Sequence, residues 1–431
     1  MIDVNPRNAK FVLQSLKESG QPPKWGASLI NVGTDRLLRQ LTQEYLKDHC
    51  APIEDLDGGG ACKWIEADYG NGKTQFLRCV QENAWQENYV TAFVELSQDE
   101  CPLDRPDKIF GAVARAIQAT PLDIPDVDRC RGLDIALEQL IERRFPGVLT
   151  GMPDDTLRDQ VIEWLNGIKS LPVESTSLLT AAVRHIVALL EGDNETVEIT
   201  RLYLRGEPLP AANLKRAGIF EKLDKSNGFR MLRTVCQLVQ RSGLATGVVL
   251  LFDEARRTLS LMSTKAQKVA CENLLSVINR CNSGEFPGTL FLYAVMPEFF
   301  TNFATNYPAL QQRCGASTRL NLNSLQGIKE ADLLEKIGFK ITSVFKIIHQ
   351  HFDVDEDVLQ HNLNVLATET IRNTGGTGTR RLMVRSCVQH LNNMLTDGVA
   401  TLNQDGAQAL VGGMSEELRS SERAEVEAEG E

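Results

Sequence analysis

The sequence lacks the features that mark membrane, secreted and metal-binding proteins. It contains no apolar run of about 18 residues, the length that a membrane-spanning helix needs. Its first ten residues lack the apolar core of a signal peptide. The 10 cysteines form no C-x-x-C pair and no cluster with the 6 dispersed histidines, so neither a disulfide framework nor a zinc site is indicated. We therefore expect a cytoplasmic protein with no membrane segment.

Positive charge is also scarce. The chain has 46 Lys and Arg against 57 Asp and Glu, and its formal net charge is −11, which gives no support to a broadly cationic nucleic-acid-binding surface. Part of this charge is local, because the last 17 residues hold seven Glu and two Arg, a charge of −5 that leaves −6 for the rest. Residues 401–431 look too polar to bury a core, and we expect an acidic, disordered tail there.

Residues 62–74, C-K-W-I-E-A-D-Y-G-N-G-K-T, combine a short apolar strand, a glycine-containing loop and the start of a helix. This succession is the setting of a phosphate-binding loop. Gly70 and Gly72 permit the backbone turn that directs N–H groups at phosphate oxygens, and the helix adds its positive end. Lys73 would reach the β- and γ-phosphates of ATP, and the Thr74 hydroxyl would bind Mg²⁺. The alternative is an ordinary strand–turn–helix corner with a chance G-K-T.

The loop departs from the usual G-x-x-x-x-G-K-[ST] pattern at its first position, where Ala67 stands in place of glycine. Because alanine tolerates a positive φ poorly, the loop must enter with an ordinary backbone conformation. The half of the loop that grips phosphate keeps its pattern. The residues that we expect to contact the nucleotide there are Tyr69, Gly70, Asn71, Gly72, Lys73, Thr74 and Gln75.

A second stretch, residues 247–254 with the sequence G-V-V-L-L-F-D-E, runs from apolar residues into two carboxylates. A continuous apolar run suits a central strand that is covered on both faces. Asp253 would hold Mg²⁺ through water, and Glu254 would orient and deprotonate the attacking water. The alternative, a buried strand ending in a helix N-cap, is weaker given the loop upstream. Together the two stretches predict a site that binds and hydrolyses ATP.

Strand and helix patterns alternate up to residue 322, which predicts a parallel sheet with helices on both faces. A helix is expected at 105–117 and another at 298–313. Lys73 and Asp253 are 180 residues apart, far more than a compact nucleotide domain needs, and the excess has helical spacing (132–145, 154–169, 176–191, 211–224). The predicted organisation is an N-terminal helix with the first part of the ATPase core (1–119), a helical insertion (120–228), the second part of the core (229–325), a helical lid (326–400) and the tail (401–431).

A turn of small residues, Val32-Gly33-Thr34-Asp35, opens a helix upstream of the loop. In AAA+ ATPases and related classes, a turn of this kind just before the core lines the adenine pocket, and Val32 and Gly33 resemble it. An N-capped helix start explains the same residues equally well.

Two arginines resemble residues that complete the ATP site of AAA+ ATPases. Arg313 ends the helix after the fourth strand, where such enzymes carry an arginine that reaches the γ-phosphate bound by a neighbouring subunit; Arg319 is the fallback. Equally, Arg313 could simply interact with the negative end of the helix dipole.

Arg380, with Arg381 as second choice, starts the last lid helix, where AAA+ ATPases carry an arginine that senses the nucleotide. A polar sensor is expected at the end of strand 288–295, yet Tyr293 is the nearest polar side chain.

These pieces resemble the ATP-binding proteins encoded in bacterial BREX (bacteriophage exclusion) defence operons, in particular the BrxD branch of that family. The matching segments are Y-G-N-G-K-T, R-L-Y-L-R-G-E-P-L-P (201–210), L-L-F-D-E-A-R-R (250–257), N-L-L-S-V-I-N-R-C-N-S-G and P-A-L-Q-Q-R, within a resemblance over residues 5–400. The resemblance implies a P-loop ATPase with AAA+ features that acts with other BREX components, a helicase among the options, in restricting phage.

We therefore expect a homo-oligomeric α/β P-loop ATPase that binds ATP and Mg²⁺ and works as a motor or a switch. Two other classes stay open. One is an ATP-dependent DNA-binding module of initiator type, for which Arg256, Arg257, Lys265 and Lys268 form a candidate patch or simply a solvated face. The other is a nucleotide-binding scaffold with negligible turnover, suggested by Ala67 and the missing polar sensor.

Overall fold

The computed structural model describes residues 5–121, 129–151, 153–254, 263–323, 328–375, 378–398 and 401–429. The chain divides into two compact units, which we name the helical unit and the sheet unit. The helical unit comprises Met1–Arg39, Glu66–Glu82 and Asn321–Glu431, and the sheet unit comprises Gln40–Ile65 and Asn83–Leu320. The N-terminal residues and the predicted phosphate-binding loop therefore group with the C-terminal helices, and not with the rest of the expected ATPase core.

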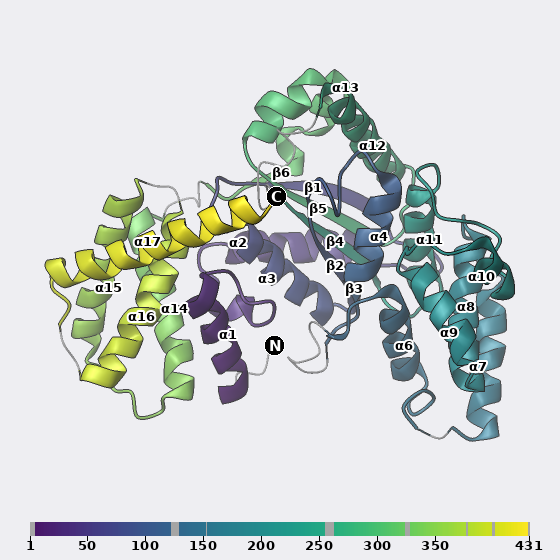
Figure 1. Ribbon diagram of the computed structural model, residues 1–431, viewed down its shortest axis with the longest axis horizontal. Helices are drawn as coiled ribbons and strands as arrows, with labels where there is room; N and C mark the ends of the chain where they lie inside the picture. Colours follow the sequence, from purple (N-terminus) through teal and green to yellow (C-terminus); the bar gives the residue numbers. More distant parts are fainter. Residues whose placement is uncertain are drawn as a thin grey trace. The chain divides into compact units, whose positions relative to one another are not determined.

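A six-stranded sheet with the order β3-β2-β4-β5-β1-β6 forms the centre of the sheet unit (Figure 1). Strand β4 pairs in parallel with β2 on one side and with β5 on the other. Every residue of β4 and β5 is buried, so both faces of the sheet are covered at its centre, as the apolar runs predict. The strands are β1 (Gly60–Glu66), β2 (Tyr89–Glu95), β3 (Ile117–Gln118), β4 (Gly247–Asp253), β5 (Thr289–Val295) and β6 (Arg319–Asn321).

The α/β class and the mostly parallel sheet are confirmed, but the edge strand β3 is antiparallel. Ile117 and Gln118 pair with Ala92 and Thr91 of β2, although the sequence predicts a helix over 105–117. The helix α4 ends at Ala116 because Ile117 takes an extended conformation (φ −65°, ψ 136°), which suits a β-branched residue.

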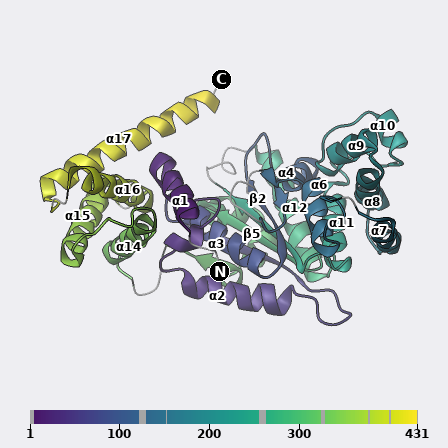
Figure 2. The same cartoon turned by 90° about the horizontal axis from the view of Figure 1, so that it is seen from below.

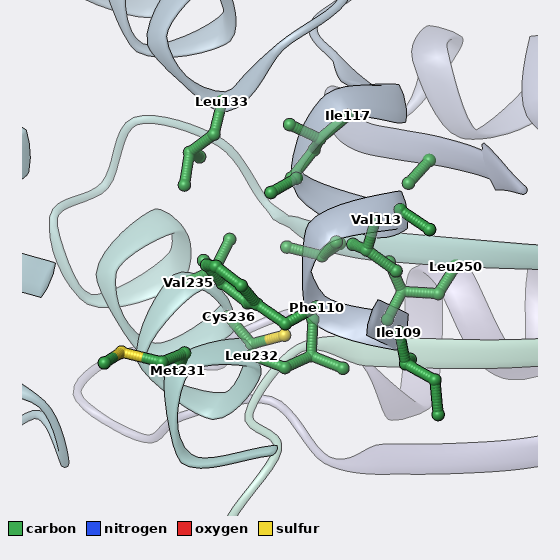
Figure 3. Packing of buried hydrophobic residues seen from close by; sticks show 14 of the residues in the cluster. Ile109, Phe110, Val113, Ile117, Leu133, Met231, Leu232, Val235, Cys236 and Leu250 are labelled. Carbon is green, nitrogen blue, oxygen red and sulfur yellow. The ribbon is translucent and has the colours of Figure 1, made fainter. Parts of the chain in front are cut away.

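Helices α4 (Pro106–Ala116) and α11 (Gly228–Arg241) pack against each other and against the sheet. Figure 3 shows this part of the core, where apolar side chains of α4, α11 and β4 meet in one buried cluster. Phe110 and Val235 are each 2% exposed, and full burial of such a side chain stabilises the fold by about 1.5–3 kcal/mol. This packing holds β4 at the middle of the sheet.

The described residues of the predicted insertion form helices, which lie together beside the sheet in Figures 1 and 2. They are α6 (Leu133–Arg144), α7 (Asp155–Ile168), α8 (Thr176–Glu191), α9 (Asn194–Leu204) and α10 (Ala211–Arg216). The sequence predicts a helix over 211–224, but α10 is shorter because Gly218 turns the chain at φ +68°. The expected helix over 298–313 is also interrupted, since Tyr307 before Pro308 is extended (φ −133°, ψ 89°).

The remaining elements of the sheet unit follow the predicted order. They are the π-helix η2 (Thr42–His49), α12 (Thr264–Asn282), η4 (Phe299–Phe303), η5 (Ala304–Asn306), α13 (Pro308–Arg313) and η6 (Ala316–Thr318). Among the described residues, no helix is both long enough and apolar enough to cross a membrane.

The helical unit is built around α1, which packs on α14 and α16. Asn5 caps α1 by accepting from the Asn8 amide, and Gly20 ends the helix at φ 64°. The helices are α1 (Pro6–Ser19), η1 (Ala27–Ile30), α2 (Asp35–Leu41), α3 (Lys73–Gln86), α14 (Glu330–Ile348), α15 (Glu356–Thr374), α16 (Thr379–Asp397) and α17 (Gln404–Glu429). The last residues of α2 (after Arg39) and of α3 (after Glu82) are assigned to the sheet unit.

The expectation of a disordered tail over residues 401–431 is wrong for helix α17. Ala407, Val411 and Leu418 are at most 9% exposed and belong to the apolar cluster of the helical unit. Their spacing of four and seven residues puts them on one face of a helix. The high charge of the last residues concealed this apolar stripe.

Candidate functional site

The predicted phosphate-binding loop is the turn between β1, which ends at Glu66, and α3, which begins at Lys73. Gly70 and Gly72 have φ values of +76° and +88°, a region that favours glycine. Ala67 is fully buried and does not have a positive φ, so the loop enters with an ordinary backbone conformation as predicted. The turn therefore needs glycine at the two positions where the sequence supplies it.

Lys73 folds back across this loop. Its ammonium group donates to the carbonyl oxygens of Ala67 (2.8 Å) and Asp68 (3.1 Å), and the residue is 7% exposed. Thr74 follows in the first turn of α3 and is half-buried. The loop thus carries a buried positive charge inside its curve, next to the N-terminal end of α3, which suits a phosphate group.

Asn323 ties the loop to the chain that follows β6. Its side-chain oxygen accepts from the Asp68 amide (2.9 Å) and from the Asn71 side chain (3.0 Å). The Leu322 amide donates to the Glu66 carbonyl (2.9 Å), which continues the same contact. No pattern in the sequence points to Asn323, because its partners lie more than 250 residues earlier.

The start of α16 lies against the same loop. The Arg380 guanidinium donates to the Asn71 carbonyl (2.5 Å) and stands 3.7 Å from the Glu330 carboxylate. Arg381 donates to the Tyr69 hydroxyl (3.2 Å). A Cβ at Gly70 would lie 2.5 Å from the Gly378 Cα, so the two backbones meet without room for a side chain.

Both candidate sensor arginines therefore contact the loop, Arg380 through the backbone and Arg381 through a side chain. Burial lowers the pKa of Arg380 from its usual value, and Glu330 opposes that shift. A guanidinium remains charged at neutral pH, so Arg380 brings a second, half-buried positive charge to the loop.

The short helix η1, which precedes the Val32-Gly33 turn, is fixed to α3, the helix after the loop. Gln75 donates to the Ala27 carbonyl (2.7 Å), and the Glu82 carboxylate accepts from the amides of Ala27 (2.7 Å) and Ser28 (3.0 Å). Burial raises the pKa of Glu82, and these hydrogen bonds act against the shift. Val32 packs on the apolar cluster of the helical unit.

The turn itself has the geometry of a helix start. Gly33 has a φ of +83°, and the Thr34 hydroxyl donates to the Asn31 side chain (2.5 Å) at the start of α2, as an N-terminal turn would. Glu82 and Gln75 hold η1, a few residues upstream of this turn, against α3. No pattern in the sequence points to this contact of Glu82.

Asp253 and Glu254 lie at the carboxyl end of β4 and are 3% and 4% exposed. Asp253 is in register with Glu95 of β2 and Ala294 of β5, and the Glu254 amide donates to the Ala294 carbonyl (2.9 Å). The expected patch residues Arg256 and Arg257 lie outside the described residues. Within the described part of the chain, no group of three His, Cys, Asp or Glu side chains could hold a metal alone. A cation there would need further ligands from water or phosphate.

The two candidate finger arginines differ in their surroundings. The Arg319 guanidinium lies 3.6 Å from the centroid of the Phe300 ring, and its Nε donates to the Cys314 carbonyl (2.6 Å). Arg313, at the end of α13, is exposed, and its guanidinium forms no hydrogen bond or ion pair with the described residues. The Arg319 side chain is therefore held by contacts within its own chain. The Arg313 side chain is not held in this way, as a contact with another subunit would require.

Tyr293 cannot take the place of the missing polar sensor. Its ring stacks on Phe252 at 4.7 Å and on Trp64 at 5.1 Å, and the residue is 3% exposed. Burial raises the pKa of Tyr293 well above its usual range. The side chain belongs to the aromatic core of the sheet unit.

A comparison with protein-family models assigns the chain to a known protein family. The family model described as "BREX system ATP-binding protein BrxC/D" matches residues 4–405. A comparison with curated proteins gave no match. Since the family match spans most of the 431 residues, the chain belongs to the family of BREX system ATP-binding proteins BrxC/D.

Proposed function

We propose that the protein binds Mg²⁺-ATP at the loop of residues 67–74 and hydrolyses it, as a P-loop ATPase with AAA+ features. The observation that carries the proposal is the Lys73 ammonium, which is buried inside a loop whose two glycines have a positive φ. A chain of the ATP-binding family with this loop would bind the phosphates through Lys73 and the loop amides. Thr74 would bind Mg²⁺.

The hydrolytic step is assigned to the carboxylates that end β4. Asp253 would hold Mg²⁺ through water, and Glu254 would orient the attacking water and accept its proton. Val32 and Gly33 would border the adenine. Arg380 would sense the γ-phosphate, a role supported by its contact with the Asn71 carbonyl.

Assembly is part of the proposal. Arg313 would reach the γ-phosphate held by a second copy, so that hydrolysis requires a homo-oligomer. Within its family, we propose that the chain is of the BrxD type and acts in the cytoplasm with other BREX components, a helicase among them. The family itself supports the ATP-binding role in BREX defence.

The experiment compares ATP binding and phosphate release of the wild type with those of Lys73→Ala and Glu254→Gln. We expect Lys73→Ala to lose nucleotide binding. Glu254→Gln should keep binding and lower turnover by about a hundredfold or more, because it removes the base. Lys63→Ala, a lysine of β1 outside the loop, is the control and should behave as the wild type. Normal turnover by Glu254→Gln would show that the base is another group.

A nucleotide-binding scaffold with negligible turnover is the second candidate. It is favoured by the burial of Tyr293, which leaves the end of β5 without a polar sensor. In that case the wild type and Glu254→Gln would bind ATP equally and neither would release phosphate, with or without added partner proteins.

A further inference from the structure

The chain between α10 and α11 exposes one aromatic ring. Phe220 is 83% exposed, the highest value among the large apolar side chains that the structure describes, although its neighbour Ile219 is 1% exposed. Phenylalanine is among the residues most often buried. A single exposed ring needs no explanation by itself, but the surroundings of Phe220 set it apart.

Hydrogen bonds hold the chain on both sides of Phe220. On the N-terminal side, the Ile219 amide donates to the Leu214 carbonyl (2.8 Å). The Glu221 carbonyl accepts from the Tyr203 hydroxyl (2.8 Å), and the Glu221 carboxylate accepts from the Ser175 hydroxyl (2.7 Å). The Asn227 side chain donates to the Lys222 carbonyl (2.9 Å). The ring is therefore presented by an ordered segment, which keeps the entropy cost of binding low.

The stretch of sequence that contains Phe220 is positively charged, in an otherwise acidic chain. Residues 211–230 hold five Lys and Arg against one Glu and one Asp, a local charge of +3 where the whole chain has −11. Arg216 and Arg230 are paired with Glu195 and Glu221. Within the described chain, no ion pair involves the exposed residues Lys215, Lys222 or Lys225.

A fourth cation comes from α8. A Cβ added to Gly218 would lie 3.2 Å from the Arg184 Nε, so the Arg184 side chain lies directly beside the turn that leads to Phe220. Arg184 is exposed, and it too forms no ion pair among the residues that the structure describes. Figure 2 shows α8, which carries Arg184, near α9 and α10; Lys215 belongs to α10, and Phe220, Lys222 and Lys225 follow it in the chain. We name Arg184, Lys215, Phe220, Lys222 and Lys225 the Phe220 patch.

The chemistry of the Phe220 patch fits a nucleic acid better than a protein. Lysine is depleted from protein interfaces, whereas it is a common partner of phosphate. An exposed ring beside such cations offers a face on which any base can stack. A cavity of about 350 Å³ is lined by Lys222 and also by four acidic residues, Asp99, Glu100, Asp107 and Glu207, which repel phosphate. We therefore do not expect a strand to enter this cavity.

We propose that the Phe220 patch is a binding site for single-stranded nucleic acid, with bases stacked on Phe220 and phosphates on Arg184 and the three lysines. A duplex would bind less well, because its paired bases already have both faces stacked. The site gives a role to the insertion, for which the sequence indicated no chemistry. It does not depend on ATP hydrolysis, since it uses none of the residues assigned to that reaction.

The test measures binding of the full-length protein to a fluorescent oligo-dT of about 20 nucleotides, longer than one single-strand site, at several salt concentrations. We expect Phe220→Ala to weaken binding by about tenfold at every salt concentration, which is the loss of one stacked base. The double variant Lys222→Ala/Lys225→Ala should lower the slope of log affinity against log salt by about 1.4, or about 0.7 for each lost phosphate contact.

Two control variants match these changes elsewhere. Leu56→Ala removes another exposed apolar side chain, 72% exposed, and Lys336→Ala/Lys340→Ala removes two exposed lysines of α14; all should bind as the wild type does. The proposal is wrong if no binding occurs at low salt, or if Phe220→Ala binds normally. It is also wrong if Phe220→Ala changes the size of the protein on a calibrated column and leaves nucleic-acid binding intact, because the patch would then be a protein contact.

Discussion

Among single residues, Arg313 and Arg319 differ sharply in their contacts although they are close in sequence. Arg319 is held by the Phe300 ring and the Cys314 carbonyl, while Arg313 is exposed at the end of α13. A guanidinium that stabilises charge in a transition state must be able to reach the neighbouring active site. The contacts of each side chain, and not its place in a motif, separate the two.

Arg313→Ala should lower ATP turnover by about a thousandfold and leave the melting temperature unchanged, because the side chain is exposed. Arg319→Ala should instead lower the melting temperature and change turnover little, since it loses a cation–π contact worth about 0.5–2 kcal/mol. Steady-state kinetics and thermal unfolding of both variants check this pair. If Arg319→Ala lost turnover and Arg313→Ala lost only stability, Arg319 would be the residue that reaches the neighbouring site.

Asn323 is a second residue whose task depends on contacts that are distant in sequence. Asn323→Ala removes the acceptor for the Asp68 amide and the Asn71 side chain, so the loop should become less ordered. We expect ATP affinity to fall by about five- to tenfold, the equivalent of one hydrogen bond of about 1 kcal/mol or slightly more. Calorimetric titration would measure it, with Asn166→Ala on α7 as the control. Unchanged affinity would mean that the loop holds its shape alone.

At the scale of whole elements, α17 is the clearest case of a helix that charge composition concealed. Val411→Asp places an unpaired carboxylate in the buried face of α17 and should destabilise the helical unit by several kcal/mol or detach the helix. Glu416→Ala on the exposed face should have no effect. Urea unfolding followed by circular dichroism distinguishes the two. Equal stability of both variants would mean that α17 contributes no packing.

Strands and most helices were predictable because their signals are local. The run of residues 247–253 and the glycines of the loop determine their own conformations, so β4 and the turns at Gly70 and Gly72 lie where the sequence predicts. Asn323, Glu82 and β3 could not be predicted. Each depends on a partner that is remote in sequence: Asp68 for Asn323, the amide of Ala27 for Glu82, and Ala92 for Ile117.

For the molecule as a whole, acid should weaken the fold through His390. Its Nε2 accepts from the Asn362 amide nitrogen at 3.0 Å, and burial lowers the pKa of His390 to about 4. The unfolded chain keeps a pKa near 6.5 and therefore binds a proton first as the pH falls. The stability should be full above pH 6.5 and decrease down to about pH 4, by roughly 3 kcal/mol in total.

Urea unfolding at a series of pH values between 7.5 and 4.5 checks this dependence. His390→Gln keeps a polar partner for Asn362 but cannot take up a proton, so it should flatten the decrease. The exposed His351, changed to Gln, should leave the decrease as in the wild type. If His390→Gln loses stability with acid as steeply as the wild type, other groups cause the effect.

The close approach of Gly70 and Gly378 has a mechanical consequence. No side-chain atom fits between the two backbones, and Arg380 forms a hydrogen bond with the loop beside them. We therefore expect the loop and the first turn of α16 to move together. We expect a movement of the loop by an incoming phosphate to displace α16, and α17 with it, because those helices pack together. The C-terminal helix α17 would then change position when phosphate binds. A fluorescent label on its exposed face would therefore report whether the loop is occupied.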